Sequence, residues 1–266
     1  MLLPRILTAV VGIPLILWLV HRGGPPFAAF TAALAVLALR EYALMLKAGG
    51  RLVQEHLAVA GGGFVALAVA FSGPTALAAV PGVGLSHLAV TLVTAAALGR
   101  EMLRKEHSLD RAALTVLGAL FIGWPLGHIA LLRESPSGEK LTFLLFISVW
   151  VTDSLAYIVG NLAGRRKLAP VLSPKKSWEG ALGGFAGALA VLWAAKTYWL
   201  QDILGPGLAL GLGVLVGVVG QSSDIAQSLV KRACGVKDSA ALLPGHGGIF
   251  DRMDSFLLLT PLFYYA

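Results

Sequence analysis

Apolar runs of about 20 residues recur along almost the whole chain, and this feature constrains the fold more than any other. Each run is long enough to cross the roughly 30 Å hydrocarbon core of a bilayer as an α-helix. Hydrophobic residues make up 57% of the 266 residues and charged residues only 13%, whereas a soluble domain carries roughly 25% charged residues. The sequence therefore predicts an all-α, polytopic integral membrane protein.

About nine transmembrane helices fit this pattern, and no separate soluble domain is visible. They are expected at about 5–20, 27–46, 55–72, 76–98, 111–133, 141–160, 178–200, 205–230 and 250–266. The fourth contains the turn-forming sequence Pro-Gly-Val-Gly at 81–84. We divide the chain into N-terminal helices (1–75), middle helices (76–160) and a C-terminal transmembrane region (161–266) that carries most of the candidate chemistry.

The distribution of positive charge predicts the orientation. Most of the 21 Lys and Arg residues fall in the even-numbered connections between these helices, and Lys and Arg are retained on the cytoplasmic side of membranes. We therefore expect the N-terminus and the charged loops in the cytoplasm and the C-terminus outside, in a bacterial cytoplasmic membrane. The net charge of +7 is explained first by this topology, and it also suits an anionic substrate or lipid headgroup. No nucleic-acid partner is expected.

Glycines and the single cysteine set two further limits. Gly180, Gly183, Gly184 and Gly187 recur at helical spacing, and 207, 211, 213 and 217 form a similar set. Such small residues predict close packing between membrane helices. Cys234 is the one cysteine of the chain, which excludes an internal disulfide and any multi-cysteine metal site.

Two polar clusters lie in the middle of the chain. Asp153 interrupts the apolar run 141–160. An acid at such a position either faces a cavity or partner or is a structural hydrogen-bonding group. A second cluster, rich in cations, occupies 164–180 and precedes a helix expected to begin near Ser177. Unpaired N–H groups at a helix start attract anions, so this segment is a candidate phosphate site or an ordinary cytoplasmic loop.

The third cluster, 222–255, is the densest. Asp224 is followed at helical spacings by Gln227, Ser228, Lys231 and Arg232, which can share one face of a helix. Further along come Lys237, His246-Gly247-Gly248, and then Asp251, Arg252 and Asp254. Carboxylates are hard oxygen ligands that suit Mg²⁺, and neighbouring cations suit phosphate oxygens. The cluster indicates a metal-assisted reaction between a nucleotide and a lipid phosphate, with His246 either at a phosphate or in a structural loop.

This cluster resembles the signature of the phosphatidate cytidylyltransferase family, also called CDP-diacylglycerol synthases. The family pattern is Ser-x-x-Lys-Arg, four residues, Lys-Asp, and then His-Gly-Gly-x-x-Asp-Arg-x-Asp. Every fixed position is present here, from Ser228-Leu229-Val230-Lys231-Arg232 to Asp254. The segment from Asp153 through Ser173-Pro174-x-Lys176-x-Trp178 is also similar.

The resemblance implies transfer of CMP from CTP to phosphatidate, giving CDP-diacylglycerol and pyrophosphate. It also implies Mg²⁺ dependence, with one or two cations, and a homodimer. The metal-binding aspartates of the family match Asp224 and Asp251. The expected catalytic set is Asp224, Lys231, Arg232, Asp251 and Asp254. The expected substrate-binding set is Asp153, Arg165, Lys167, Ser173, Lys175, Lys176, Lys237, His246, Gly247, Gly248 and Arg252.

The sequence departs from the family at two positions. Members often carry Gly-Asp-x-x-Glu-Ser where this chain has Ser223-Asp224-Ile225-Ala226-Gln227-Ser228, and Gln227 supplies no carboxylate charge. A glycine often stands where this chain has Leu155.

Two other functions stay open. One is a CTP-dependent membrane lipid kinase, which would need a base for its neutral alcohol nucleophile. The other is an organic-anion transporter, although such proteins often contain paired internal repeats and none is visible in this sequence.

Overall fold

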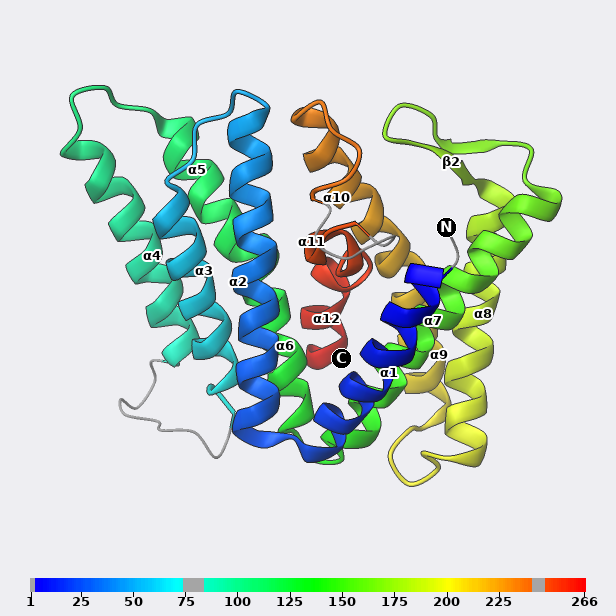
Figure 1. Cartoon of the computed structure of the whole chain (residues 1–266). Coiled ribbons are helices and arrows are strands. Elements are labelled where there is room, and N and C mark those ends of the chain that lie inside the picture. Colours follow the sequence, from blue (N-terminus) through cyan, green and yellow to red (C-terminus); the bar gives the residue numbers. More distant parts are fainter. Residues whose placement is uncertain (1–2, 74–83, 241–246) are drawn as a thin grey trace. The chain divides into compact units, whose positions relative to one another are not determined.

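The computed structural model describes residues 3–73, 84–240 and 247–266 (Figure 1). The chain forms two compact units, and each includes a segment from the C-terminal part of the sequence. The first unit comprises Met1–Glu139 and Ala233–Met253, and the second comprises Lys140–Arg232 and Asp254–Ala266. The three regions expected from the sequence stay a prediction.

The first unit is a bundle of helices. Its elements are α1 (Leu3–Arg22), α2 (Gly24–Ala48), α3 (Glu55–Ala70), α4 (Leu85–Met102), α5 (Leu109–Gly118), the π-helix η1 (Ala119–Gly123), α6 (Trp124–Arg133) and α11 (Ile249–Arg252). Glycines allow α3 to approach η1 and α6 closely. A Cβ atom on Gly123 would lie 2.3 Å from the carbonyl oxygen of Gly62, and one on Gly127 would lie 2.5 Å from that of Ala66. Backbone contact of this kind is typical of membrane helices.

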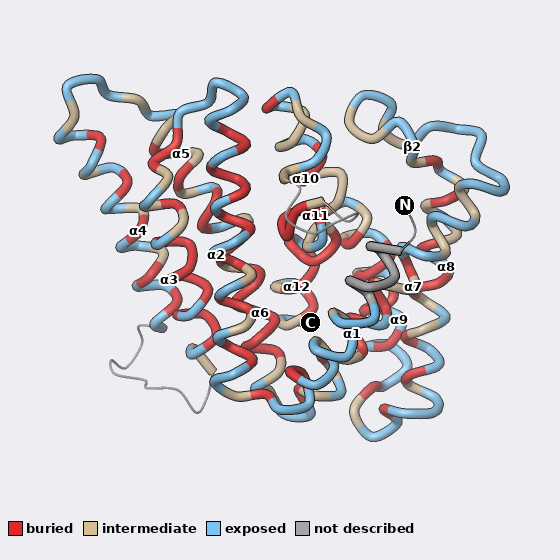
Figure 2. The backbone as a smooth tube through the Cα atoms, in the orientation of Figure 1, coloured by how far each residue is buried: buried red, intermediate tan, exposed pale blue. Residues whose placement is uncertain are grey.

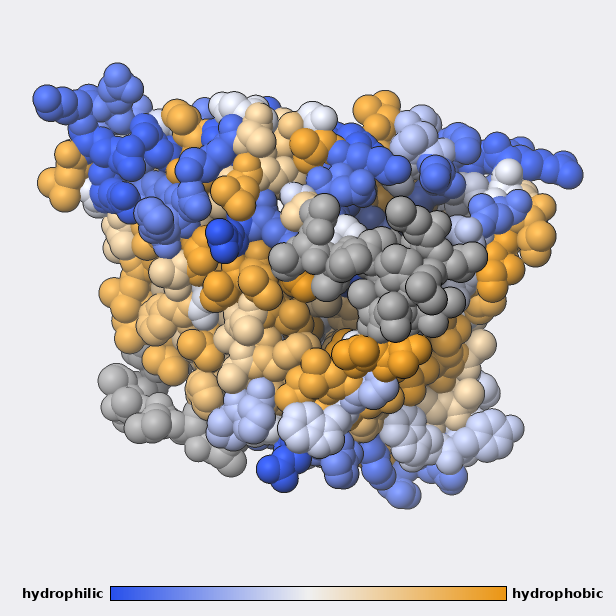
Figure 3. All heavy atoms as spheres, viewed as in Figure 1, coloured by the Kyte–Doolittle hydropathy of each residue, from blue (hydrophilic) through white to orange (hydrophobic). Residues whose placement is uncertain are grey.

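The surface of this unit matches an apolar solvent. Large hydrophobic side chains such as Leu44, Phe64 and Leu92 are exposed on α2, α3 and α4. Figure 3 shows hydrophobic residues over the middle of these helices and hydrophilic residues at the α4–α5 connection. The inward faces of α2 and α3 are buried along much of their length (Figure 2).

The second unit contains the cation-rich segment. Its elements are most of α7 (Gly138–Ala163), β1 (Lys167–Ala169), β2 (Ser173–Ser177), α8 (Trp178–Tyr198), α9 (Pro206–Leu215), the π-helix η2 (Val216–Gly220), α10 (Gln221–Ala233) and α12 (Phe256–Tyr265). The two strands pair antiparallel, with Lys167 opposite Ser177 and Ala169 opposite Ser173.

The predicted glycine packing is confirmed in part. In α8, a Cβ atom on Gly180 would lie 2.7 Å from the carbonyl oxygen of Ala156 in α7, and one on Gly183 would lie 2.6 Å from a methyl group of Val159. Gly213 and Gly217 pack in the same way on Leu189 and Phe185 of α8. By contrast, Gly207 and Gly211 have open space beside them.

Five helices within the described ranges are long and apolar enough to cross a membrane. They are Gly24–Ala48, Leu109–Arg133, Gly138–Ala163, Trp178–Tyr198 and Pro206–Ala233. Three more apolar helices are shorter: Val10–Arg22, Glu55–Ala70 and Phe256–Tyr265. The chain is thus a largely helical integral membrane protein, but the count of about nine spans is not confirmed.

Two of the nine predicted spans differ in detail. Part of the fourth, 76–98, lies outside the described residues, and α4 begins at Leu85. The expectation of one continuous helix over 250–266 is wrong, because α11 ends at Arg252 and α12 begins at Phe256. Asp251 lies in α11, whereas Asp254 lies in the turn between the helices, so the two acids do not share one helix face.

Candidate active site

Two cationic side chains, Lys176 and Arg232, connect the β1–β2 hairpin to α10. The Lys176 ammonium lies 2.6 Å from Oδ2 of Asp224 and 3.4 Å from the carbonyl oxygen of Gln221. The Arg232 Nε atom donates a hydrogen bond to the carbonyl oxygen of Leu172, at 3.2 Å. These contacts join the cation-rich segment to the helix that carries Asp224.

The Lys176–Asp224 pair is partly exposed. Its side chains retain 23% and 25% of their accessible surface, and ion pairs this open to solvent contribute only about 0–1 kcal/mol to stability. The pair is therefore a weak stabilising element. Its consequence is mainly electrostatic, because it places a positive charge directly against a carboxylate.

The start of α8 is less open to phosphate than the sequence suggested. The Ser177 side chain caps the helix by accepting a hydrogen bond from the Gly180 N–H, at 3.2 Å. The Trp178 N–H donates to the carbonyl oxygen of Arg166, at 2.9 Å. The Glu179 carboxylate turns back and accepts the N–H of Arg165, at 3.0 Å. Protein acceptors thus occupy two of the N–H groups at the helix start, which leaves phosphate binding mainly to the side-chain cations.

The predicted substrate-binding residues of this segment differ in their exposure to solvent. Arg165, Lys167 and Lys175 are exposed, whereas Lys176 and Ser173 are half-buried. Lys231 and Arg232 lie half-buried at the end of α10. Asp224, Gln227, Ser228 and these two cations are all on α10, which confirms the predicted helix.

Asp153 and Asp254 are linked through one serine. The hydroxyl of Ser255 lies 3.3 and 3.4 Å from the two carboxylate oxygens of Asp153 on α7. The Ser255 N–H donates to Oδ1 of Asp254, at 2.8 Å. Ser223, which is fully buried next to Asp224, donates its hydroxyl to the carbonyl oxygen of Asp254. A polar chain therefore runs from α7 through the turn before α12 to α10.

Asp251 belongs to the first unit and is almost fully buried, with 6% of its surface exposed. Its Oδ2 atom accepts the N–H of Gly248 at 3.0 Å and both the N–H and the hydroxyl of Ser239 at 2.9 Å. The carboxylate therefore caps the start of α11 and fixes the Ser239 segment. Because hydrogen bonds to a charged group stabilise by about 1.5–3 kcal/mol each, Asp251 has a structural task beside any metal role.

Glu41 of α2 holds the same segment from the other side, and the sequence-based prediction missed it. It is also 6% exposed. Its two carboxylate oxygens accept the N–H groups of Ile249 and Phe250, each at 2.9 Å. The hydroxyl of Ser239 lies 2.9 Å from Oε2 of Glu41. A buried acid within an apolar helix is a strong functional signal, but the adjacent Arg40 makes this position resemble the charged end of a span.

The two described glycines of the His-Gly-Gly motif have distinct reasons to be glycine. Gly247 has a φ of +78°, in the left-handed region that glycine adopts readily. A Cβ atom on Gly248 would lie 2.2 Å from Oε2 of Glu41 and 2.3 Å from the hydroxyl oxygen of Ser239. The motif therefore allows the backbone to approach Glu41. His246 lies outside the described residues.

Aromatic contacts reinforce this attachment. Phe250 is fully buried, and its ring meets the rings of Tyr42 and Phe121 edge to face, at centroid distances of 6.2 and 6.5 Å. The Tyr42 hydroxyl donates to the carbonyl oxygen of Leu114, at 2.9 Å. Hence α11 is anchored on α2 by both a polar and an apolar contact.

The donor chemistry suits magnesium. The residues described by the structure contain no group of three or more His, Cys, Asp or Glu side chains that could hold a metal ion. Magnesium, however, is usually bound through one or two carboxylates together with substrate phosphates and water. Asp224 and Asp251 fit that donor set. They belong to different units, so their joint role stays a prediction, as do those of the exposed Lys237 and Arg252.

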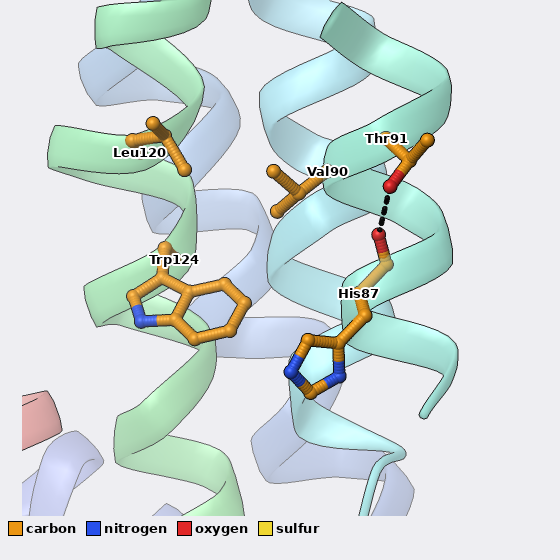
Figure 4. A pocket seen from close by; sticks show the side chains of 5 residues that line it. All are labelled: His87, Val90, Thr91, Leu120 and Trp124. Atoms are coloured by element: carbon orange, nitrogen blue, oxygen red, sulfur yellow. Dashed lines mark hydrogen bonds between the residues drawn. The ribbon is translucent and has the colours of Figure 1, made fainter. Parts of the chain in front are cut away.

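A separate cavity of about 370 Å³ lies in the first unit between α4 and the η1–α6 helix (Figure 4). It is lined by His87, Val90 and Thr91 from α4 and by Leu120 and Trp124 from the facing helix. Among the residues that the structure describes, its lining carries no acid and none of the predicted site residues. This cavity is therefore not the candidate active site.

Comparison with known proteins identifies the family. A profile of the cytidylyltransferase family matches residues 3–266, and the chain belongs to this family. A phosphatidate cytidylyltransferase from Staphylococcus haemolyticus (strain JCSC1435) is 32% identical over 262 residues, which cover 97% of this chain and 96% of that protein. The resemblance inferred from the sequence motif is thus confirmed.

Two further relatives match over shorter stretches. The phosphatidate cytidylyltransferase of Synechocystis sp. (strain ATCC 27184 / PCC 6803 / Kazusa) is 45% identical over 135 residues, or 49% of this chain and 44% of that protein. That of Staphylococcus aureus (strain COL) is 36% identical over 159 residues, which span 60% of each chain. The match thus covers less than two thirds of the length of these two relatives.

Proposed function

We propose that this protein is a membrane-embedded nucleotidyltransferase that transfers CMP from CTP to phosphatidate, forming CDP-diacylglycerol and pyrophosphate. The observation that carries the proposal is the joining of the cation-rich hairpin to the Asp224 helix through Lys176. The contact brings a lysine of the cation-rich segment against a carboxylate, which supports phosphate binding there, and relatives of the chain bear the name of this activity.

The reaction needs an anionic nucleophile, a positioned triphosphate and a stabilised leaving group. The lipid phosphate attacks the α-phosphorus of CTP, the bond to the β-phosphate oxygen breaks, and pyrophosphate leaves with that electron pair. A phosphate monoester has a second pKa of about 6, so the nucleophile is already anionic near pH 7 and requires no general base. Lys176, Arg165, Lys167, Lys231 and Arg232 offset the charge on the triphosphate and the leaving pyrophosphate.

Asp224 and Asp251 are the proposed holders of Mg²⁺, with a second cation as an option. A bound divalent cation would supply charge neutralisation at the phosphate oxygens. The protein's own contribution is to fix the two carboxylates. Lys176 positions Asp224, and the hydrogen bonds from Gly248 and Ser239 position Asp251.

The proposed setting is a bacterial cytoplasmic membrane, with the N-terminus and the site loops in the cytoplasm and the C-terminus outside. CTP then reaches the site from the cytoplasm and phosphatidate from the inner leaflet. The proposed assembly is a homodimer, which the mass of the purified protein after subtraction of bound detergent would test.

A product assay tests the function. Purified protein is incubated with CTP, Mg²⁺ and phosphatidate, and lipid and phosphate products are measured. The expected result is equal formation of CDP-diacylglycerol and pyrophosphate. Release of CDP with a phosphorylated lipid alcohol would favour the lipid kinase, and substrate uptake by vesicles without any chemistry would favour the organic-anion transporter.

A further inference from the structure

Glu41 is the strongest unassigned group in the described residues. It is a buried acid within α2, a helix apolar enough to cross a membrane. An ionisable residue in such a place is costly unless it has partners and a task. Its partners are three donors, all from the motif-bearing segment: the N–H groups of Ile249 and Phe250 and the hydroxyl of Ser239.

The contacts of Glu41 converge with those of Asp251. The Ser239 hydroxyl lies 2.9 Å from Oε2 of Glu41 and 2.9 Å from Oδ2 of Asp251. A hydroxyl has one hydrogen to donate, so Ser239 serves either carboxylate and links the two. Gly248 lies in the same junction, donating its N–H to Asp251 while its Cα faces Glu41.

We propose that Glu41 is a positioning residue that fixes the Asp251 carboxylate and the Gly247–Gly248 turn in the geometry needed to bind Mg²⁺. The inference rests on the proposed function, in which Asp251 holds the cation. Partners that orient a ligating carboxylate affect metal affinity or activity by about 10- to 100-fold when they are changed. Glu41 acts through Asp251 and the turn, and α2 supplies a rigid support.

The test variant is Glu41→Gln, which keeps the size of the side chain but replaces one carboxylate oxygen with an NH₂ group. That group would face an N–H or a hydroxyl donor, so part of the contact with α11 is lost. The matched control is Glu101→Gln. Glu101 is in the same unit, is also 6% exposed, and accepts hydrogen bonds from Gln54 at 2.7 Å and from the Ser108 N–H at 3.1 Å.

Two readouts separate positioning from general stability. The first is the Mg²⁺ concentration that gives half the maximal rate. The second needs no catalysis: it is the rise in unfolding temperature of the purified protein when Mg²⁺ is added without CTP, which reports binding to the folded state. Glu41→Gln should raise the Mg²⁺ midpoint by about tenfold or more and diminish the Mg²⁺-dependent rise. Glu101→Gln should lower the unfolding temperature but leave both Mg²⁺ responses intact.

Ser239→Ala provides a second variant in case Glu41→Gln does not fold. It removes the hydroxyl that links the two carboxylates and keeps the Ser239 N–H that Asp251 accepts. Its Mg²⁺ midpoint should rise in the same direction. Parental Mg²⁺ responses in Ser239→Ala together with parental responses or no folding in Glu41→Gln would overturn the positioning role, as would equal Mg²⁺ defects in Glu41→Gln and Glu101→Gln.

Asp251→Asn distinguishes failure of this inference from failure of the proposed metal role. If Asp251→Asn loses its Mg²⁺ response while Glu41→Gln and Ser239→Ala keep theirs, only the positioning role is wrong. If Asp251→Asn itself responds to Mg²⁺ as the parent does, the metal assignment and the positioning role both fail. The formation of CDP-diacylglycerol by the parent protein is measured in a separate assay, which tests the proposed function.

Discussion

The Lys176 ammonium and the Asp224 carboxylate lie 2.6 Å apart, although one belongs to the β1–β2 hairpin and the other to α10. The contact unites two clusters that are far apart in the sequence. The ammonium offsets the charge of the acid, and both side chains are partly exposed. The pair therefore links the predicted phosphate-binding and metal-binding functions.

Replacing Lys176 with methionine should reduce activity with CTP much more than it reduces stability. The change removes the charge and keeps an unbranched side chain of similar length. Activity with CTP should fall by about a hundredfold, the lower end of the loss seen when a positioned electrostatic group is removed. Stability should change by about 1 kcal/mol or less, because the pair is partly exposed. Initial rates over a range of CTP concentrations and a thermal melt measure the two effects.

Lys196→Met is the matched control for this variant. Lys196 is a half-buried lysine of the same unit, near the end of α8, and lies over the Trp193 ring at 5.3 Å. Its loss should leave the rate within about twofold. If Lys176→Met loses activity only in proportion to its loss of folded protein, Lys176 has a structural role and no special relation to CTP.

The helical membrane fold could be predicted from the sequence because apolar runs of spanning length are a strong and local signal. Helix breaks depend on subtler interactions. The run 250–266 looks continuous, yet the chain turns at Asp254, where the Ser255 N–H and the Ser223 hydroxyl find acceptors. The Asp254 side chain is a local acceptor for the Ser255 N–H, whereas the Ser223 contact comes from the tertiary structure, so hydropathy alone does not reveal the turn.

Gly248→Ala should destabilise the first unit and abolish most of the activity. The added methyl group would lie 2.2 Å from Oε2 of Glu41 and 2.3 Å from the Ser239 hydroxyl oxygen. Overpacking of a closed site costs about 1–3 kcal/mol, and the strain would fall directly on the Asp251 segment. Thermal unfolding and CDP-diacylglycerol formation measure the two effects.

Gly211→Ala serves as the control for the glycine variant. It lies in α9 with no neighbouring atom within 4 Å of an added Cβ, so it should be tolerated or slightly stabilising. If Gly248→Ala has the same unfolding temperature and activity as the parent, the close contact between Gly248 and the Glu41 carboxylate is wrong.

A charged sequence motif indicated part of the candidate site, whose residue roles stay predictions, whereas no pattern in the sequence indicated Glu41. Asp224, Lys176 and Asp251 stand out as polar residues in a known motif pattern. Glu41 is distant in sequence from that motif, and its role depends on the packing of α11 against α2 through Phe250 and Tyr42. Long-range packing of this kind leaves no periodic or motif signal, so the structure is needed to assign it.

The orientation in the membrane can be tested by cysteine labelling in sealed vesicles. Cys234 is buried, and burial raises the pKa of its thiol, so it should react slowly with maleimides; Cys234→Ala removes it altogether. In that background, Lys167→Cys and Lys237→Cys place thiols at exposed sites predicted to be cytoplasmic. Both should resist an impermeant reagent added outside right-side-out vesicles, whereas Asp202→Cys should react. The reverse pattern would overturn the predicted orientation and the cytoplasmic route for CTP.

The metal assignment is tested most directly by Asp224→Asn and Asp251→Asn. Each change keeps the volume of the side chain and removes its anionic charge. If both acids hold Mg²⁺ at the reacting phosphates, each variant should lose about a thousandfold in rate, which corresponds to about 4 kcal/mol of transition-state stabilisation. The double variant should be little worse than either single one, because residues that act as one unit fail together.

The effects on folding should differ between the two variants, and this difference makes the test sharper. Asp224→Asn weakens the partly exposed ion pair with Lys176. Asp251→Asn disturbs a cap that receives three hydrogen bonds, so it should also lose about 1–3 kcal/mol of stability. Gln227→Ala, which truncates a fully buried side chain, should lower stability with a much smaller effect on rate per folded molecule. Rates against Mg²⁺ concentration and thermal melts for all four variants decide the matter, and a near-parental rate in either aspartate variant would remove that residue from the metal site.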